Sequence, residues 1–167
     1  IINDLDRVNG AGYGIVVATD SCGSSPKLAF IVQDGRTGWL YNCSGLSNPQ
    51  VNTWYHALGI YNTTDNSSRF YINGKLVGSV SLPSSYTKSS KNFKIGRSAY
   101  HNGAFFNGFL DEIKIYPYAR TPEQIKADYA AGLAGVGSTK GSSAIMGSSG
   151  LQSALNDGLV AYYKMDK

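Results

Sequence analysis

The sequence predicts an all-β protein, an antiparallel β-sandwich with one short helix at 121–131. Short runs of β-branched and aromatic residues alternate with polar residues, which is typical of half-buried strands. Turn-forming pairs, Asp34-Gly35 and Asn73-Gly74, separate such runs and indicate tight hairpins. Charged residues make up only 16% of the chain, and its 20 glycines favour a fold with many turns.

The first strands are predicted to form a three-stranded meander. A β-branched run at 13–19, an alternating run at 27–33 and a return strand at 36–41 follow one another. In an antiparallel meander the ends of the first and third strands lie at the same edge of the sheet. Cys22 and Cys43 follow those two ends, so we expect a disulfide between them, two reduced thiols being the alternative. A disulfide would indicate an extracytoplasmic compartment.

The next strand is predicted at 53–61, with Trp54 and His56 on one apolar face. His56 is interpreted as a hydrogen-bonded core residue rather than a catalyst, because no second catalytic group accompanies it. After the Asn-Gly hairpin, a short strand at 92–96 and a loop at 97–107 are expected.

The last strand of this region is predicted at 108–116, and its alternation places Asp111 on the same face as apolar residues. A helix should begin directly afterwards. Thr121 suits the N-cap and Gln124 suits the reciprocal position of a capping box. The helix is expected to end at Gly132.

Three segments in this order carry a family resemblance. Residues 54–61 resemble the Trp-x-His strand of the LamG-like, concanavalin A-type jelly rolls, and residues 70–78 resemble their Tyr-x-Asn-Gly hairpin. Residues 108–116, with the helix after them, resemble the C-terminal signature of the same family. The resemblance covers 12–131 and implies a jelly-roll sandwich of the laminin G-like lectin/glucanase superfamily. It leaves function open, because this fold hosts lectins, adhesive modules, spacers and glycosidases.

The family pattern also predicts a domain organisation. Residues 1–131 correspond to the second half of a sandwich, 132–157 read as a Gly/Ser-rich linker, and 158–167 resemble the strand that opens a jelly roll. We therefore expect a fragment or a processed product of a longer polypeptide. The terminal strand is expected to complete a sheet, either in cis beside Ile113 or in trans in a neighbouring subunit.

The resemblance favours a non-enzymatic extracellular or cell-surface module that binds glycans or mediates cell adhesion. Aromatic rings and planar polar groups are suited to sugars, and ordinary packing is the alternative for each such residue. The candidate ligand-binding residues are Trp39, Tyr41, Tyr100, His101 and Asn102.

Two other functions are weighed against this one. The first is a structural repeat or filament subunit, joined to other copies through exchange of residues 158–167. The second is a glycoside hydrolase, which needs a pair of suitably spaced carboxyl groups. Asp111 and Glu112 are predicted to point to opposite faces, and no further Glu stands at the required spacing, so we do not expect an enzyme.

The charge distribution and the available metal-ligating residues limit the partners and cofactors that we expect. The net charge is +4 but Lys and Arg are scattered, which favours a solvated surface over nucleic-acid binding. No apolar run is long enough to cross a bilayer. No cofactor is expected apart from a structural calcium ion, for which Asp111 and Asp166 are the candidate ligands. The alternative is that backbone amides satisfy Asp111.

Three Asn-x-Ser/Thr sequons permit N-glycosylation if the chain enters a suitable secretory route. Their acceptor residues are Asn42, Asn62 and Asn66.

Overall fold

The computed structural model describes most of the chain from residue 2 to residue 163. The described residues are 2–3, 5, 11–18, 21–33, 38–82, 89, 91–99, 104–136 and 161–163. They belong to two compact units. One unit comprises Ile1–Ile72 and Leu76–Gly108, and the other comprises Asn73–Lys75 and Phe109–Lys167.

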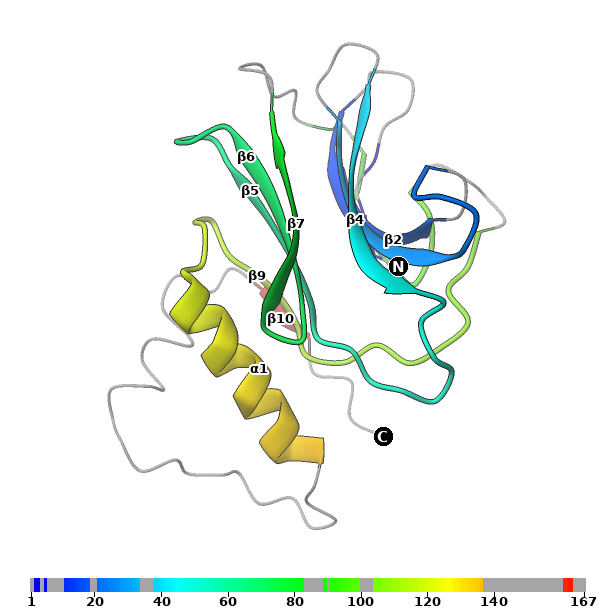
Figure 1. Ribbon diagram of the computed structural model, residues 1–167, viewed down its shortest axis with the longest axis vertical. Helices are drawn as coiled ribbons and strands as arrows, with labels where there is room; N and C mark the ends of the chain where they lie inside the picture. The colour runs from blue at the N-terminus through cyan, green and yellow to red at the C-terminus, as the bar shows by residue number, and fades with distance from the viewer. Residues whose placement is uncertain are drawn as a thin grey trace. The chain divides into compact units, whose positions relative to one another are not determined.

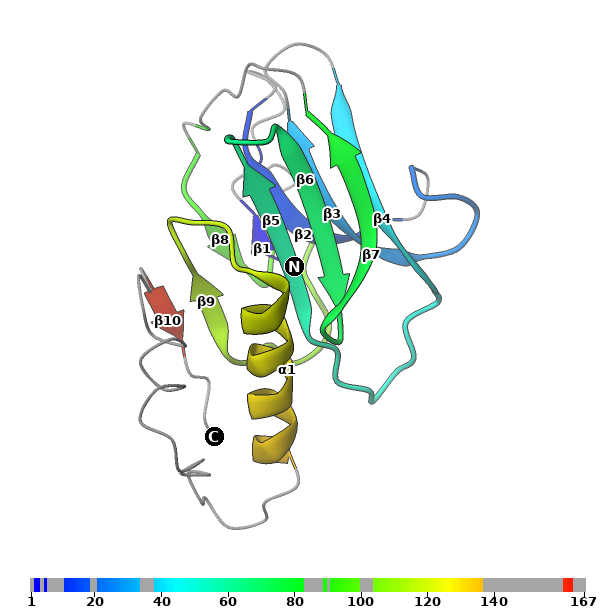
Figure 2. The same ribbon diagram turned by 60° about the vertical axis from the view of Figure 1, so that its left-hand side comes forward.

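The first unit is an antiparallel β-sandwich, as the sequence predicts. Figures 1 and 2 show its two sheets stacked face to face. The larger sheet has the strand order β4-β3-β2-β1-β8, formed by β1 (Ile2–Asn3), β2 (Tyr13–Ala18), β3 (Lys27–Gln33), β4 (Trp39–Ser47) and β8 (Lys94–Ile95). The smaller sheet has the order β5-β6-β7, formed by β5 (Ala57–Asn62), β6 (Ser67–Ile72) and β7 (Lys75–Ser81).

The core lies between these sheets and follows the period of two along the strands. Phe30 of β3 is 3% exposed and stacks on Phe70 of β6, with ring centroids 6.4 Å apart. Gly59 of β5 makes room for the Phe30 ring, because a Cβ at Gly59 would lie 2.2 Å from Cδ2 of Phe30. Other members of the cluster are Leu28, Val32, Ile72 and Leu82.

A polar bridge joins the two sheets inside this core. Asn42 of β4 is 2% exposed, and its Nδ2 donates a hydrogen bond of 2.8 Å to the carbonyl of Ser68 in β6. Such a bond satisfies a buried amide that would otherwise cost free energy. The predicted glycan acceptor Asn42 is thus buried and hydrogen-bonded in the folded protein, and its glycosylation stays a prediction. Asn62 and Asn66, in and beside the turn between β5 and β6, stay predictions.

The hairpin between β6 and β7 is confirmed. Asn73 and Gly74 have φ of 51° and 73°, the left-handed values that a two-residue turn of this kind needs at both positions. Two other boundaries differ from the prediction. The strand expected to end at Tyr41 continues to Ser47, and the strand expected from residue 53 begins at Ala57. Trp54 consequently lies outside β5 and is 55% exposed, not part of an inner face.

The second unit contains α1 (Pro122–Val136), which begins with the predicted capping box. The N–H of Thr121 donates to Oε1 of Gln124 at 2.9 Å, and the N–H of Gln124 donates to Oγ1 of Thr121 at 3.3 Å. The helix does not end at Gly132 as predicted. A helical glycine costs only about 1 kcal/mol relative to alanine, so the helix continues to Val136.

A short ladder completes the second unit. The strand predicted at 108–116 is reduced to β9 (Ile113–Ile115), because Glu112 has a φ of 52° and interrupts the extended backbone. It pairs antiparallel with β10 (Ala161–Tyr163), with Ala161 opposite Ile115 and Tyr163 opposite Ile113. This pairing is the in-cis arrangement raised from the sequence. The expected linker lies largely outside the described residues, apart from its first five residues, which form the end of α1.

Candidate ligand-binding surface

The candidate surface is the outer face of β4, the edge strand of the larger sheet. Asn42 and Leu40 point into the sandwich, so alternation directs Trp39 and Tyr41 to the opposite face. In the register between β3 and β4, Trp39 lies opposite Gln33 and Tyr41 lies opposite Ile31. Since β4 ends the strand order, no further strand of the described residues flanks this pair.

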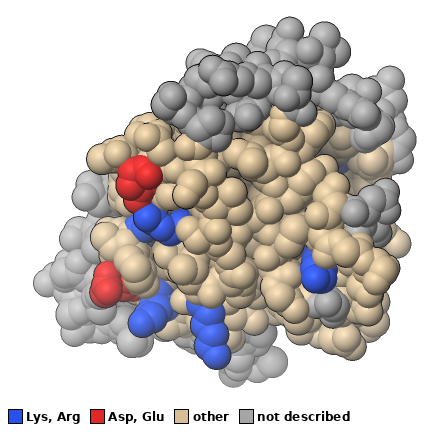
Figure 3. Space-filling view, turned by 45° about the horizontal axis from the view of Figure 1, so that its top comes forward, with Lys and Arg blue, Asp and Glu red and all other residues tan. Residues whose placement is uncertain are grey.

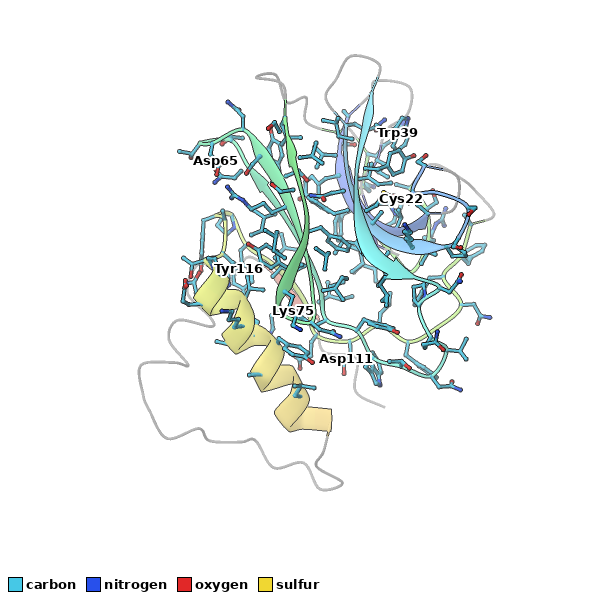
Figure 4. All side chains as sticks on the ribbon, viewed as in Figure 1. Cys22, Trp39, Asp65, Lys75, Asp111 and Tyr116 are labelled. Carbon is cyan, nitrogen blue, oxygen red and sulfur yellow. A yellow bond between two sulfur atoms is a disulfide. The ribbon has the colours of Figure 1, made fainter. Side chains whose placement is uncertain are left out.

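Trp39 and Tyr41 form one aromatic platform. Their ring centroids lie 6.2 Å apart with an interplanar angle of 27°, and both side chains are half-buried. Figure 4 shows Trp39 beside β4, with Cys22 near the same strand. Two neighbouring rings on one face of a strand form an extended apolar surface.

The predicted disulfide is present next to this platform. Cys22 and Cys43 are bonded, with an S–S distance of 2.02 Å and a Cα–Cα distance of 5.7 Å. Cys43 follows Tyr41 by two residues and thus lies on the same face of β4. The bridge ties the connection between β2 and β3 to the edge strand, which restrains the backbone that carries the two rings.

The surroundings of the platform are uncharged along the chain. No Asp, Glu, Lys or Arg occurs between residues 37 and 64. Figure 3 shows Lys and Arg mainly at one side of the face in view, some of them beside Asp or Glu, while most of the other described surface in view is uncharged. The sequence around the platform therefore contains no cluster of cations of the kind that binds a polyanion.

Comparison with known families agrees with this architecture. The model of the concanavalin A-like lectin/glucanases superfamily called Laminin_G_3 matches residues 2–126. This chain belongs to the concanavalin A-like lectin/glucanases superfamily. A search of curated protein sequences found no match to this superfamily member.

Two solved structures resemble this superfamily member. A native heptameric SAP-like pentraxin from Limulus polyphemus matches with a TM-score of 0.57 and 16% identity, over 78% of this chain and 62% of the pentraxin chain. An S-layer domain-containing protein from Clostridium thermocellum ATCC 27405 matches with a TM-score of 0.41 and 22% identity, over 72% of this chain and 57% of that chain. The match to the pentraxin supports the jelly-roll fold. The match covers less than two thirds of the length of the pentraxin chain and of the S-layer protein chain.

The other predicted binding residues of this superfamily member lie outside the described residues. They are Tyr100, His101 and Asn102. The segments on either side of them are paired, with the N–H of Ser98 donating to the carbonyl of Ala104 at 2.9 Å. Asn3 holds the first of these segments, since its Nδ2 donates to the carbonyl of Arg97 and its Oδ1 accepts from the N–H of Ala99. The structure thus unites Trp39 with Tyr41 and leaves the remaining three residues as predictions.

The calcium ion expected at Asp111 and Asp166 stays a prediction. The side chain of Asp111 was expected to point inward, but it is exposed, and its Oδ1 accepts a 2.8 Å hydrogen bond from the N–H of Glu112. Within the described ranges no three His, Cys, Asp or Glu side chains gather into a metal-binding group. Asp166, the other predicted ligand, lies outside those ranges.

Glu112 Oε2 lies 3.2 Å from Nζ of Lys114, so this carboxylate forms an ion pair within its own strand region. In the part of the chain that the structure describes, no helix has both the length and the apolarity required to span a membrane.

Proposed function

We propose that this chain is a non-enzymatic carbohydrate-binding module of the extracellular space or the cell surface, which contacts glycans through Trp39 and Tyr41. The observation that supports the proposal is the stacked pair of rings on the outer face of β4. Sugar rings have apolar faces that pack against aromatic rings, and the amphipathic Trp and Tyr side chains are suited to such partly wet contacts. The uncharged neighbourhood favours neutral glycans over acidic ones.

Two properties support the location and the absence of hydrolysis. The Cys22–Cys43 disulfide favours an oxidising compartment, because thiols are kept reduced in the cytosol. The adjacent carboxylates Asp111 and Glu112 are engaged with a backbone amide and with Lys114 respectively. These two contacts differ from the arrangement that glycosidases require, in which two carboxyl groups face each other about 5–10 Å apart.

The test is a glycan array probed with the full chain and with Trp39→Ala and Tyr41→Ala. We expect each substitution to weaken binding about tenfold or more, as removal of a central aromatic contact does. Phe109→Ala is the matched control, because Phe109 is an aromatic residue that is 72% exposed and belongs to the other unit. Retained binding by both platform variants, or equal loss in the control, would contradict the proposed site. A chain that binds no glycan would contradict the function.

A second candidate function is assembly through exchange of β10 between copies. The observation that favours it is the ladder between β9 and β10, which is only three residues long. The same antiparallel pairing can form between two copies, and an exchanged element preserves every contact of the monomer. Repeated exchange would join subunits into a filament.

Exchange can be tested by mixing two single-cysteine variants. Lys114 and Tyr162 are partners in the ladder, and both native cysteines are already bonded to each other. A mixture of Lys114→Cys and Tyr162→Cys chains should form a mixed disulfide dimer under mild oxidation if β10 is exchanged. Gly45→Cys mixed with Tyr162→Cys is the control, since Gly45 lies in β4. Equal yields in both mixtures would contradict exchange.

A further inference from the structure

The loop between β4 and β5 presents a second aromatic side chain to solvent. Five consecutive residues, Gln50 to Trp54, are exposed. Val51 is 86% exposed and Trp54 is 55% exposed, whereas large aromatic side chains are usually buried to a high degree. The family resemblance placed Trp54 in a core strand, and the turn-forming Asn48, Pro49 and Asn52 before it are the sequence signal for a loop.

Hydrogen bonds to Pro26 and Tyr55, and one within the loop itself, hold this loop. The N–H of Asn48 donates to the carbonyl of Pro26 at 2.8 Å. The N–H of Gln50 donates to the hydroxyl of Tyr55 at 3.0 Å, and the Tyr55 ring packs against the hydrophobic core. Nε2 of Gln50 donates to the carbonyl of Asn48 at 3.1 Å. The loop is therefore tied at its start and at its end to the framework of the sheets.

Two residues of the loop adopt left-handed backbone conformations. Asn48 has a φ of 53° and Asn52 has a φ of 57°. Asparagine tolerates this region better than most residues, but its use still costs free energy that the surrounding contacts must offset. A loop fixed in this way loses little conformational entropy on binding a ligand, so its affinity is not reduced by an ordering step.

The chemistry of the exposed residues selects the class of ligand. Trp54 offers a flat apolar face, and Gln50, Asn52 and Thr53 bring amide and hydroxyl groups, of which Nε2 of Gln50 and Oγ1 of Thr53 also donate to carbonyls within the loop. No charged residue lies between residues 37 and 64, which disfavours phosphate-rich ligands and anionic lipid surfaces because both require Lys or Arg. A neutral molecule with an apolar ring face and many hydroxyl groups matches this set.

We propose that the loop from Asn48 to Trp54 is a second contact site for neutral saccharides, with Trp54 as its stacking ring. The inference takes its ligand class from the proposed function but concerns a different site. Asn48 follows Trp39 by nine residues, so the start of the loop lies up to about 30 Å from Trp39 along β4. A polymeric saccharide that engages both sites would gain avidity that a single sugar lacks.

Single-tryptophan variants test this proposal directly, because the chain contains only two Trp residues, Trp39 and Trp54. In Trp39→Phe the fluorescence reports on the loop, and in Trp54→Phe it reports on the β4 platform. Acrylamide quenching is measured with soluble neutral β-glucan and mannan, with heparin as a charged control and phosphatidylcholine vesicles as a lipid control. We expect a neutral polysaccharide to reduce the quenching constant of Trp54 about twofold, as contact shields one ring face.

A second measurement separates the two sites. Trp54→Ala should weaken binding to immobilised polysaccharide about tenfold while leaving the thermal midpoint unchanged, because the side chain is exposed. Val51→Ala is the control for loop structure.

The measurements separate a failure of the loop site from a failure of the platform site. If the platform variants lose binding while Trp54→Ala keeps it and Trp54 is not shielded, the loop site is overturned and the proposed function stands. If Trp54 is shielded while Trp39 is not, the loop site stands and the platform is overturned. Shielding of Trp54 by vesicles alone overturns the saccharide proposal.

Discussion

The guanidinium of Arg120 forms a hydrogen-bonded ion pair with the carboxylate of Asp128, with Nη2 2.9 Å from Oδ1 and Nε 3.2 Å from Oδ2. The two side chains are 2% and 6% exposed. Nη1 of Arg120 also donates to the hydroxyl of Tyr118 at 3.1 Å, and its Cζ lies 4.4 Å from the centre of the Tyr116 ring. Burial alone would lower the pKa of Arg120, but the hydrogen bonds with Tyr118 and Asp128 raise it above its ordinary value. The cluster fastens the segment after β9 to α1.

Breaking this ion pair should strongly destabilise the second unit. We expect Asp128→Asn to lower the free energy of unfolding by about 3–5 kcal/mol, because the buried Arg120 charge loses its partner. Asp65→Asn is the matched control, since Asp65 pairs with Arg69 on the surface, where an ion pair contributes little. Urea denaturation of both variants measures the difference. Similar losses in the two would show that the Arg120 pair is not a buried structural contact.

The close approach of the Phe30 ring to Gly59 predicts that an alanine at this glycine is more destabilising than an alanine at Gly45. In Gly59→Ala the new methyl group would collide with the Phe30 ring, and we expect a loss of about 1–3 kcal/mol. Gly45→Ala is the control, because a Cβ at Gly45 meets nothing within 4 Å and this glycine also lies in a strand. Its stability should change by no more than about 0.5 kcal/mol. Equal thermal midpoints for the two variants would contradict the close contact between the sheets.

Removal of the disulfide should destabilise the sandwich and loosen the platform. Cys22 and Cys43 are 21 residues apart, and closing a loop of this size is worth about 3 kcal/mol in the chain-entropy model. We therefore expect the double variant Cys22→Ser/Cys43→Ser to unfold at lower urea concentration. Wild-type protein with and without reductant provides the control. An unchanged midpoint would mean that the bridge adds no restraint to β4.

Stability should fall at alkaline pH partly because of Tyr116. Burial raises the pKa of Tyr116 above 10.0, and the nearby Asp128 carboxylate adds to the effect. The folded protein thus holds the phenolic proton more tightly than the unfolded chain does, so this contribution is complete below pH 10 and is lost as the pH rises through the folded pKa. Urea midpoints measured from pH 8 to above pH 11 should fall less steeply for Tyr116→Phe. Tyr61→Phe is a useful comparison, because burial also raises the pKa of Tyr61.

Local signals in the sequence predicted the elements whose causes are local. The strand at 27–33 matches β3 at both ends. The start of α1 was found because Thr121 and Gln124 form a capping box within one turn. The Asn73-Gly74 turn was found because few other residue pairs tolerate its backbone conformation. Each of these signals is complete within a few residues.

The failures involve contacts between residues distant in sequence. β4 extends to Ser47 because Ser47 pairs with Lys27 of β3, and this pairing overrides the poor strand propensity of Gly45. Asp111 was expected to point inward, but the left-handed Glu112 breaks the alternation on which that expectation relied.

The candidate site was predicted where a local pattern was sufficient and missed where contacts between distant residues decide the structure. The spacing of Trp39 and Tyr41 by two residues was enough to place both rings on one face of a strand. The exposure of Trp54 was not predicted, because its apolar neighbours resembled a continuous strand. The ladder with β6 begins at Ala57, which lies opposite Ile72 at the end of β6, and hydrogen bonds hold the preceding loop to Pro26 and Tyr55.

The buried amide of Asn42 has a consequence for biosynthesis. The nitrogen that bridges the sheets to Ser68 is also the one that an oligosaccharyl transferase would modify in the sequon Asn42-Cys43-Ser44. Were the chain translocated into a compartment with that enzyme, burial of Asn42 between the sheets and sugar attachment would compete during the lifetime of the nascent chain. A molecule modified there first could no longer close its sandwich, so rapid folding would itself protect the domain.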